Sequence, residues 1–332
     1  MAVCRFNSFI YLRPLFRRTG ITTDKASYKA YVRNRRKKRK RKDCLMEILR
    51  YTFFQNALWG GLFTAIACGI VGTYVVSRRL VFISGGVTHA SFGGLGLGFY
   101  LGVNPFLTAL GFAVLSAFGV EWMSRSRRVR EDSAIAAIWS LGMAIGAIFI
   151  VLTPGYAPNL SSYLFGNILT ISRTDIYWTG GFAAALSLFF TLYYRAVLYS
   201  AFDRDFARTQ GLPVKAIEYV MTLFISVTIV LSIRLVGIML LMSLLTVPQM
   251  TVNLFTSNFR KIIFGSIGLG FASCVTGLYL SYILQIPSGA FIIVVLIACF
   301  LAAKLFHLIV RKISSASATC PASTPTPADR SR

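Results

Sequence analysis

The chain has 332 residues, of which 55% are hydrophobic and only 14% are charged. A soluble domain usually carries about a quarter charged residues, so this composition argues against a soluble globular protein. The formal net charge is +24, but residues 1–45 carry 15 of the 35 Lys and Arg. The rest of the chain is mildly basic, which is typical of a membrane protein with basic cytoplasmic loops. We therefore expect no nucleic-acid partner.

The two ends differ from the middle of the chain. Nine of the ten residues 33–42 are basic, and such a block repels itself and predicts disorder. Residues 1–45 are interpreted either as an extension that binds anionic lipid or nucleic acid, or as sequence upstream of a working protein that starts at Met46. We favour the second interpretation. Residues 313–332 are rich in Ser, Thr, Pro and Ala, which also predicts a disordered tail.

Residues 46–312 form the predicted transmembrane domain. They contain eight or nine runs that are long and apolar enough to cross a bilayer, and spanning backbone of this kind must be helical. In chain order, the expected spans are 52–77, 80–101, 106–123, 133–152, 176–198, 214–233, 236–255, 262–284 and 290–307. The stretch 153–173, with several Pro and Gly, is not expected to span. The predicted fold class is an all-α, polytopic membrane helix bundle.

Basic loops indicate the orientation of these spans. Lys and Arg gather in five places that are separated from one another by two spans, namely 78–79, 125–130, 203–215, 260–261 and 311–312. Cytoplasmic loops carry an excess of Lys and Arg, so this side is predicted to face the cytoplasm.

Other charged residues lie near predicted span ends. Glu121 and Asp175 are expected at the membrane interfaces, and Arg234 at the outer surface, where it divides two predicted spans. Glu218 lies near the cytoplasmic start of its span, where Lys215 is a candidate ion-pair partner. None of these residues is assigned to substrate.

Several enzyme and cofactor motifs are absent. The sequence has no G-x-x-x-x-G-K-[ST] phosphate loop, no H-E-x-x-H and no G-x-S-x-G. Its six Cys are scattered without a C-x-x-C pair, which predicts neither a disulfide framework nor a cysteine metal site. We expect a chain that is not itself an enzyme and does not bind ATP.

His89 is the only ionisable residue within its predicted span. Ionisable groups inside a membrane are costly and are usually functional, and imidazole suits divalent transition metals. Gly85 and Gly93 share its helix face, with Gly86 and Gly96 nearby. This bare face predicts either a cavity on a substrate path or close packing of a neighbouring helix. One His is too little for a metal site, so other ligands or a dimer mate would have to contribute.

The motifs around His89 and beyond resemble those of the permease family of ABC importers for zinc, manganese and iron. The resemblance runs through most of residues 46–312. It is carried by SRR (77–79), GVTHAS (86–91), GVNP (102–105), RED (130–132), TPGYAP (153–158), SYLFGNIL (162–169), VG (236–237) and TVP (246–248).

The resemblance implies a homodimeric, multi-pass permease of the cell (inner) membrane. Two cytoplasmic ATP-binding subunits would hydrolyse ATP, and a separate extracytoplasmic binding protein would deliver the metal. The divalent metal is then the transported substrate, and no permanently bound cofactor is expected. Family members often place an Asp four residues before the motif His; Gly85 stands at that position here, so the Asp–His pair is absent.

A polar linker matches the family's cytoplasmic pattern of acid, acid, Ala and Gly. These residues are Asp203, Asp205, Ala207 and Gly211. The resemblance implies a short coupling helix that sits in a groove of the ATPase. Ala207 would permit close approach, Phe206 could anchor the contact, and Gly211 would allow a C-terminal turn. The alternative is an ordinary solvated loop.

Three other functions stay open. A related ABC permease for a siderophore or corrinoid chelate would have a wider cavity and would not need His89. An ion-coupled secondary carrier should show intramembrane acids in inverted repeats, which the sequence does not clearly contain. A membrane scaffold would leave the linker motif unexplained.

Overall fold

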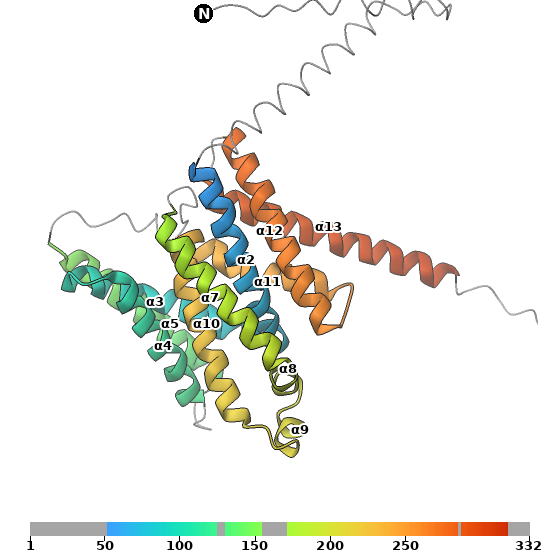
Figure 1. The fold of residues 1–332 in the computed structure, drawn as a ribbon, viewed down its shortest axis with the longest axis horizontal. Coiled ribbons are helices and arrows are strands. Elements are labelled where there is room, and N and C mark those ends of the chain that lie inside the picture. The colour runs from blue at the N-terminus through green and yellow to red at the C-terminus, as the bar shows by residue number, and fades with distance from the viewer. Residues whose placement is uncertain (1–51, 125–129, 155–170, 285–286, 318–332) are drawn as a thin grey trace, which may run out of the picture. The chain divides into compact units, whose positions relative to one another are not determined.

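The computed structural model describes residues 52–124, 130–154, 171–284 and 287–317 (Figure 1). All regular elements in these ranges are helices, which confirms the all-α fold class. They are α2 (Thr52–Ser77), α3 (Val81–Leu101), α4 (Pro105–Ser124), α5 (Glu131–Leu152), α7 (Arg173–Leu192), α8 (Tyr194–Phe202), α9 (Arg204–Thr209), α10 (Val214–Val236), α11 (Ile238–Asn253), α12 (Phe259–Leu284) and α13 (Ser288–Ser317).

The contacts within the chain divide it into two compact units, residues 1–54 and 55–332. The helical bundle belongs to the second unit. The predicted N-terminal extension, 1–45, lies outside the described residues. So does most of the predicted C-terminal tail, although α13 continues as a helix to Ser317.

The number of clear spans differs from the predicted eight or nine. Among the described residues, six helices are long and apolar enough to cross a membrane, and α7 with α8 makes a seventh that is bent by 79°. Helix α11 has only 16 residues, which is short for a span. Helix α3 has 21 residues, but its glycines and His89 lower its hydropathy. Each of the nine predicted runs is nevertheless helical.

Helix α2 packs against α7, α11 and α12 through positions with little or no side chain. A Cβ atom at Gly72 would lie 2.5 Å from the carbonyl oxygen of Leu245, and one at Gly69 would lie 3.2 Å from the backbone nitrogen of Ile267. Small residues let helix backbones approach closely in a membrane, where van der Waals packing rather than the hydrophobic effect drives helix association. The small residues of α2 therefore place it within the bundle.

Helix α11 contains a proline, and a neighbouring side chain satisfies the group that the proline leaves unpaired. Pro248 lies inside the helix and lacks the N–H that would have bonded the carbonyl of Leu244. The Gln249 side-chain nitrogen donates to that carbonyl oxygen at 3.2 Å and to the carbonyl oxygen of Cys68 at 2.8 Å. Gln249 thus satisfies the carbonyl that Pro248 leaves unpaired in α11 and also connects α11 to α2.

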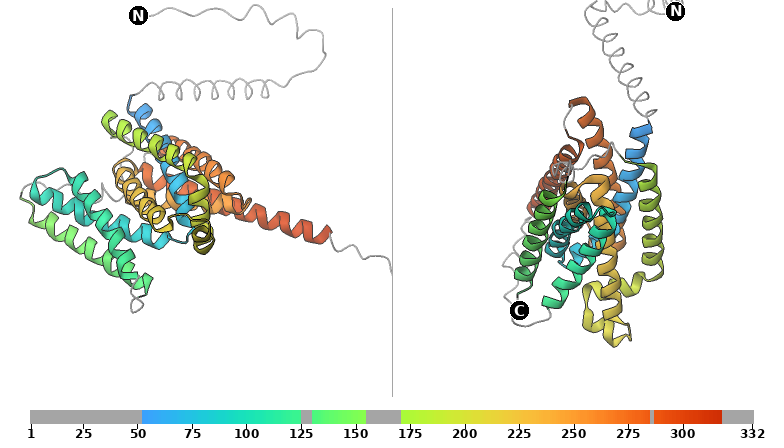
Figure 2. Two further views of the ribbon diagram at one scale, coloured as in Figure 1. Left: turned by 60° about the horizontal axis from the view of Figure 1, so that its bottom comes forward. Right: turned by 90° about the vertical axis from the view of Figure 1, so that its left-hand side faces the viewer.

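Helices α3, α4 and α5 pack closely on one another, and Figure 2 shows them as a group at one edge of the bundle. The connection from α3 to α4 is a tight turn in which Gly102 has φ +65°, and the Val103 N–H donates to the Gly98 carbonyl oxygen at 3.1 Å. This hydrogen bond closes a helix C-terminal turn that favours glycine. Helix α10 contacts both α3 and α4 and connects this group to the other helices.

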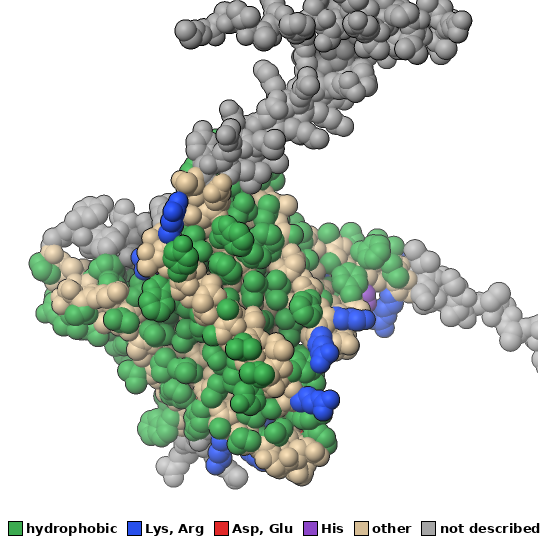
Figure 3. Space-filling model, in the orientation of Figure 1, with side chains coloured by type: hydrophobic (Ala, Val, Ile, Leu, Met, Phe, Trp, Pro, Cys, Tyr) green, Lys and Arg blue, Asp and Glu red, His purple; other side chains and the backbone are tan. Residues whose placement is uncertain are grey.

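The outer surface is strongly apolar, as expected for a chain whose helices face lipid. Large exposed hydrophobic side chains include Leu115, Val151, Leu188, Phe264 and Leu305. Figure 3 shows a broad hydrophobic face, with most of the visible Lys and Arg near α9 and toward the end of α13. This arrangement agrees with a multi-pass membrane protein whose basic loops lie on one side.

Candidate functional site

His89 lies on α3 and stacks flat against Trp139 of α5. The ring centroids are 4.3 Å apart and the planes differ by 7°. The His89 side chain is half-buried, and its Nδ1 atom has no hydrogen-bond partner among the described residues. The stack fixes the plane of the imidazole and leaves a buried nitrogen without a protein ligand.

The position one turn before His89 is filled by a thioether from another helix. At Gly85, a Cβ atom would lie 2.9 Å from Cε and 4.0 Å from Sδ of Met242 on α11. A methionine is a soft and adaptable side chain. An acid at this position would meet that methionine.

The other predicted glycines contact α5. A Cβ atom at Gly96 would lie 2.5 Å from the carbonyl oxygen of Gly146, and one at Gly93 would lie 2.8 Å from that of Gly142. At Gly86, it would lie 2.7 Å from a side-chain methyl of Ile135. These glycines lie against neighbouring backbone and side chains rather than around an open cavity.

In the part of the chain that the structure describes, no three His, Cys, Asp or Glu side chains are close enough together to hold a metal ion. His89 accordingly stands without further ligands of these types within the described residues.

The linker motif forms the short helix α9. The Asp203 side chain accepts hydrogen bonds from the backbone N–H groups of Asp205 at 2.9 Å and Phe206 at 3.0 Å, as an N-cap should. Ala207 is fully buried. At the other end, Gly211 has φ +73°, and the next residue donates its N–H to the Ala207 carbonyl oxygen at 3.2 Å. The motif therefore encodes both ends of one helical turn and a half.

The surface of α9 carries an aromatic ring and an ion pair. Phe206 is 45% exposed and makes an edge-to-face contact with Tyr199 of α8, with ring centroids 5.3 Å apart. Asp205 pairs with Arg208 at 3.0 Å, and both side chains are largely exposed. An exposed Phe with charged neighbours at a helix turn suits a protein contact.

Glu218 connects α9 to the end of α2. Its Oε1 atom lies 2.8 Å from Nε of Arg204 and 2.9 Å from Nη2 of Arg78. Among the described residues, these two arginines rather than Lys215 form its ion pairs, so the sequence-based choice of partner was wrong. Lys215 is close in sequence, whereas Arg78 is 140 residues away and gives no local signal.

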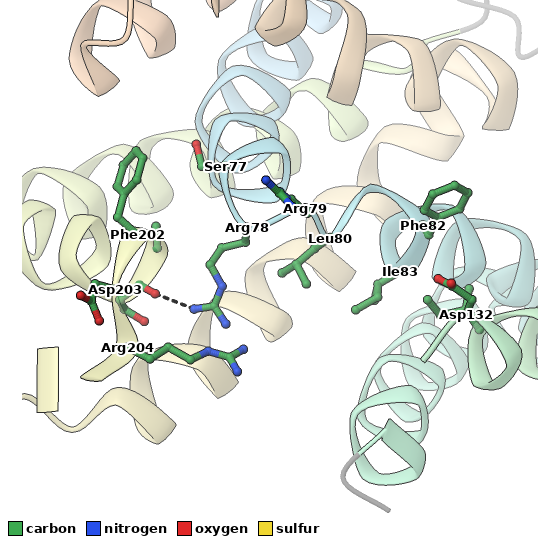
Figure 4. Close-up of a pocket in the computed structure, with 13 residues that line it drawn as sticks. Ser77, Arg78, Arg79, Leu80, Phe82, Ile83, Asp132, Phe202, Asp203 and Arg204 are labelled. Atoms are coloured by element: carbon green, nitrogen blue, oxygen red, sulfur yellow. Dashed lines mark hydrogen bonds between the residues drawn. The ribbon is translucent and has the colours of Figure 1, made fainter. Parts of the chain in front are cut away.

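A cavity of about 540 Å³ lies beside this cluster (Figure 4). The α2–α3 turn, the start of α5 and the α8–α9 segment line it, contributing among others Arg79, Phe82, Asp132 and Arg204. Figure 4 shows Arg78 reaching toward the α8–α9 segment, where its Nη1 donates to the Ser200 carbonyl oxygen at 2.6 Å.

A second long-range ion pair lies at the other ends of α7 and α10. Arg234 Nη1 is 2.9 Å from Asp175 Oδ1, and its guanidinium lies over the Phe106 ring at 4.6 Å. Asp175 is buried and also completes a capping box with Ser172. The sequence placed Asp175 and Arg234 near span ends but did not pair them.

The chain is similar to several known membrane proteins. It is 36% identical over 265 residues to the uncharacterized membrane protein slr2045 of Synechocystis, covering 80% of this chain and 94% of that protein. It is 32% identical over 260 residues to the manganese transport system membrane protein MntC of Halalkalibacterium halodurans, covering 78% and 89%.

Two solved structures share the fold. PsaBC from Streptococcus pneumoniae, in complex with Fab, is similar with a TM-score of 0.72 and 28% identity, covering 78% of this chain and 93% of that one. An inward-facing putative metal-chelate type ABC transporter has a TM-score of 0.61 and 14% identity, covering 78% and 85%. At that identity, the second likeness shows the fold alone.

The ABC 3 transport family matches residues 50–307, a range that includes α2 through most of α13 and contains both His89 and α9. The match confirms the family resemblance that the motifs in residues 46–312 predicted. The chain is a multi-pass protein of the cell membrane and belongs to the ABC 3 transport family.

Proposed function

We propose that this chain is the permease subunit of an ABC importer that carries a divalent metal ion into the cytoplasm. The observation that carries the proposal is the family match over residues 50–307, because it includes the whole described helix bundle except the last turns of α13. Relatives of similar length are named as manganese transport proteins, including MntC of Halalkalibacterium halodurans and the permease ScaB of Streptococcus parasanguinis. Among zinc, manganese and iron, these names favour manganese.

The proposal includes partners that this chain needs. A separate ATP-binding subunit would hydrolyse ATP, an extracytoplasmic binding protein would deliver the metal, and two copies of the permease would form the membrane pathway. The metal is the transported substrate and not a resident cofactor. Chelate transport is less well supported, since the chelate-type neighbour is only 14% identical.

We assign α9 to the contact with the ATP-binding subunit. Asp203 and Gly211 define its two ends, buried Ala207 seats it against the bundle, and Phe206 and Asp205 are exposed. The exposed side chains are available to a partner. The basic residues around α9 favour the cytoplasmic side for this contact.

We assign His89 to the metal pathway. Its Nδ1 atom is buried without a partner among the described residues, and an unpaired buried polar atom costs free energy. Neutral imidazole nitrogen is a good ligand for divalent transition metals. Further ligands would come from the second copy or from water carried by the ion.

Manganese uptake in a host that lacks its own importer tests the proposal. The chain is expressed with its ATP-binding subunit and binding protein, and uptake of radioactive manganese is compared for wild type, His89→Ala and His307→Ala. His307→Ala is the matched control, because the sequence has only two His. We expect His89→Ala to lower uptake at least ~tenfold, as loss of a metal-site group usually does, and His307→Ala to leave it unchanged.

Three results would count against the proposal. Uptake that continues when the ATP-binding subunit is inactivated would exclude an ATP-driven permease. Absence of manganese, zinc and iron uptake in the wild type would exclude a metal importer. Uptake only of a chelated metal would favour the chelate function instead.

The domain boundaries stay part of the proposal. We propose that residues 46–312 form the working permease and that residues 1–45 are dispensable. A variant that begins at Met46 should match the full-length chain in membrane yield and manganese uptake. A large loss of uptake at equal yield would assign a function to the basic extension.

A further inference from the structure

One carboxylate oxygen holds together three segments that are far apart in the sequence. Glu218 lies in the first turns of α10, and its Oε1 atom accepts a hydrogen bond from Arg78 and forms an ion pair with Arg204. Arg78 is only 7% exposed and Glu218 17%. Charged groups removed from water are costly unless paired, and removal of one partner leaves an uncompensated charge. The three side chains therefore act as a unit.

The Arg78 end of the cluster is built into a rigid turn. The Leu80 N–H donates to the Val75 carbonyl oxygen at 2.8 Å, and the Arg79 N–H donates to that of Val76 at 3.1 Å. These two bonds form a helix C-terminal motif in which one residue adopts a left-handed conformation and is usually glycine. Here that residue is Arg79, with φ +60°. Helix α3 begins at Val81, directly after this turn, so a displacement of Arg78 reaches the helix that carries His89.

The Arg204 end belongs to α9. Arg204 is the first residue of this helix and follows its cap, Asp203. Its side chain is 56% exposed, whereas the carboxylate it meets is largely buried. Helix α9 packs on α8 and α10, and the Arg78 Nη1 atom also holds the Ser200 carbonyl of α8 at 2.6 Å. The cluster thus joins the α8–α9 segment to the α2–α3 turn.

The cavity beside the cluster leaves room for movement. Its volume is about 540 Å³, and it separates the α8–α9 segment from the start of α3 and of α5 (Figure 4). Closely packed atoms transmit movement from one element to the next, and an open space does not. Arg78 and Arg204 both line this space, and their side chains meet at Glu218 of α10.

We infer that the Arg78–Glu218–Arg204 cluster couples the movement of α9 to the α2–α3 turn. This inference rests on the proposed function, in which the ATP-binding subunit acts on α9. Nucleotide-driven displacement of α9 pulls on Glu218 and Arg78 and so shifts the cytoplasmic start of α3. Glu218 is a positioning residue, because it acts through the turn and does not touch the metal.

The test measures metal uptake and ATP hydrolysis together in the reconstituted transporter with its binding protein. The variants are Arg204→Ala and Glu218→Gln. Arg195→Ala is the matched control, since it removes an exposed arginine of the neighbouring helix α8 that lies outside both α9 and the cluster. Arg204→Lys restores the charge and should recover part of the coupling.

We expect metal imported per ATP hydrolysed to fall ~tenfold in Arg204→Ala and Glu218→Gln, within the usual range of coupling between sites. ATP hydrolysis and co-purification with the ATP-binding subunit should stay within about twofold of wild type, and Arg195→Ala should keep the wild-type ratio. Because the Arg204 side chain is largely exposed, Arg204→Ala should not disturb folding. A lower ratio of imported metal to hydrolysed ATP in this variant therefore indicates lost coupling and not misfolding.

The inference fails if Arg204→Ala and Glu218→Gln lower uptake and ATP hydrolysis in equal proportion, or if the control loses coupling as much as they do. In both cases wild-type uptake is normal. Absence of wild-type uptake would instead refute the proposed function, so the two failures are distinguishable.

Discussion

The contact between α3 and α5 at Gly96 predicts a sharp difference between two similar substitutions. In Gly96→Ala, the new methyl group would lie 2.5 Å from the carbonyl oxygen and 2.8 Å from the Cα of Gly146. Both atoms are backbone, so neither can rotate away. At Gly111 of α4, a Cβ atom meets nothing within 4 Å. Gly111→Ala is therefore the matched control for the change in helix propensity.

The size of the effect follows from the distances. Carbon atoms pack at roughly 3.5–4 Å, so α3 and α5 must separate by about 1 Å, which loses up to about half of the attraction between the facing atoms. Overpacking of this kind costs about 1–3 kcal/mol, whereas alanine gains up to about 1 kcal/mol over glycine in a helix. Because both variants gain this propensity, it cancels, and we expect Gly96→Ala to be less stable than Gly111→Ala by about 1–3 kcal/mol.

Thermal unfolding of the detergent-solubilised protein measures this difference. A gap of this size should separate the two variants by about 2 °C or more in Tm. The same separation of helices should disturb the His89–Trp139 stack, whose centroids are 4.3 Å apart, and lower metal uptake in Gly96→Ala alone. Equal Tm values for the two variants would refute the close α3–α5 contact.

Two further substitutions test contacts of α11. Gln249→Leu should destabilise the protein by about 1–3 kcal/mol, because the Leu244 carbonyl beside Pro248 loses its donor. Pro248→Ala should recover part of that loss in a thermal unfolding assay, and the absence of any recovery would contradict the repair role of Gln249. Gly85→Asp should keep the yield of folded protein close to that of the wild type, because the atom nearest to the new Cβ, Cε of Met242 at 2.9 Å, is the end of a flexible side chain that can move aside. A much lower yield that Met242→Ala restores would contradict this flexibility of Met242.

Much of the fold could be predicted from the sequence because hydrocarbon imposes a local rule. Any run of about 20 apolar residues must be helical to satisfy its backbone, and each predicted run is a helix. The end of α2 at Ser77 agrees with the predicted span 52–77. The bend of 79° between α7 and α8 was not predicted, since the break at Tyr193 contains neither proline nor glycine.

The ends of α9 were also readable, because caps are local. Asp203 bonds backbone groups two and three residues away, and Gly211 adopts a conformation that disfavours other residues. The family resemblance was carried by such short motifs, and the match over residues 50–307 confirmed it. The roles of His89 and α9 in transport stay predictions.

By itself, the sequence determined that this protein lies in the membrane, where its helices fall and which family it resembles. Only the tertiary structure decided which side chains meet. Arg78 and Glu218 pair across 140 residues, and His89 stacks on Trp139 of another helix. The length of an apolar run and the capping of a helix depend only on residues that are near in sequence. Ion pairs and ring contacts between helices depend on how the whole bundle packs.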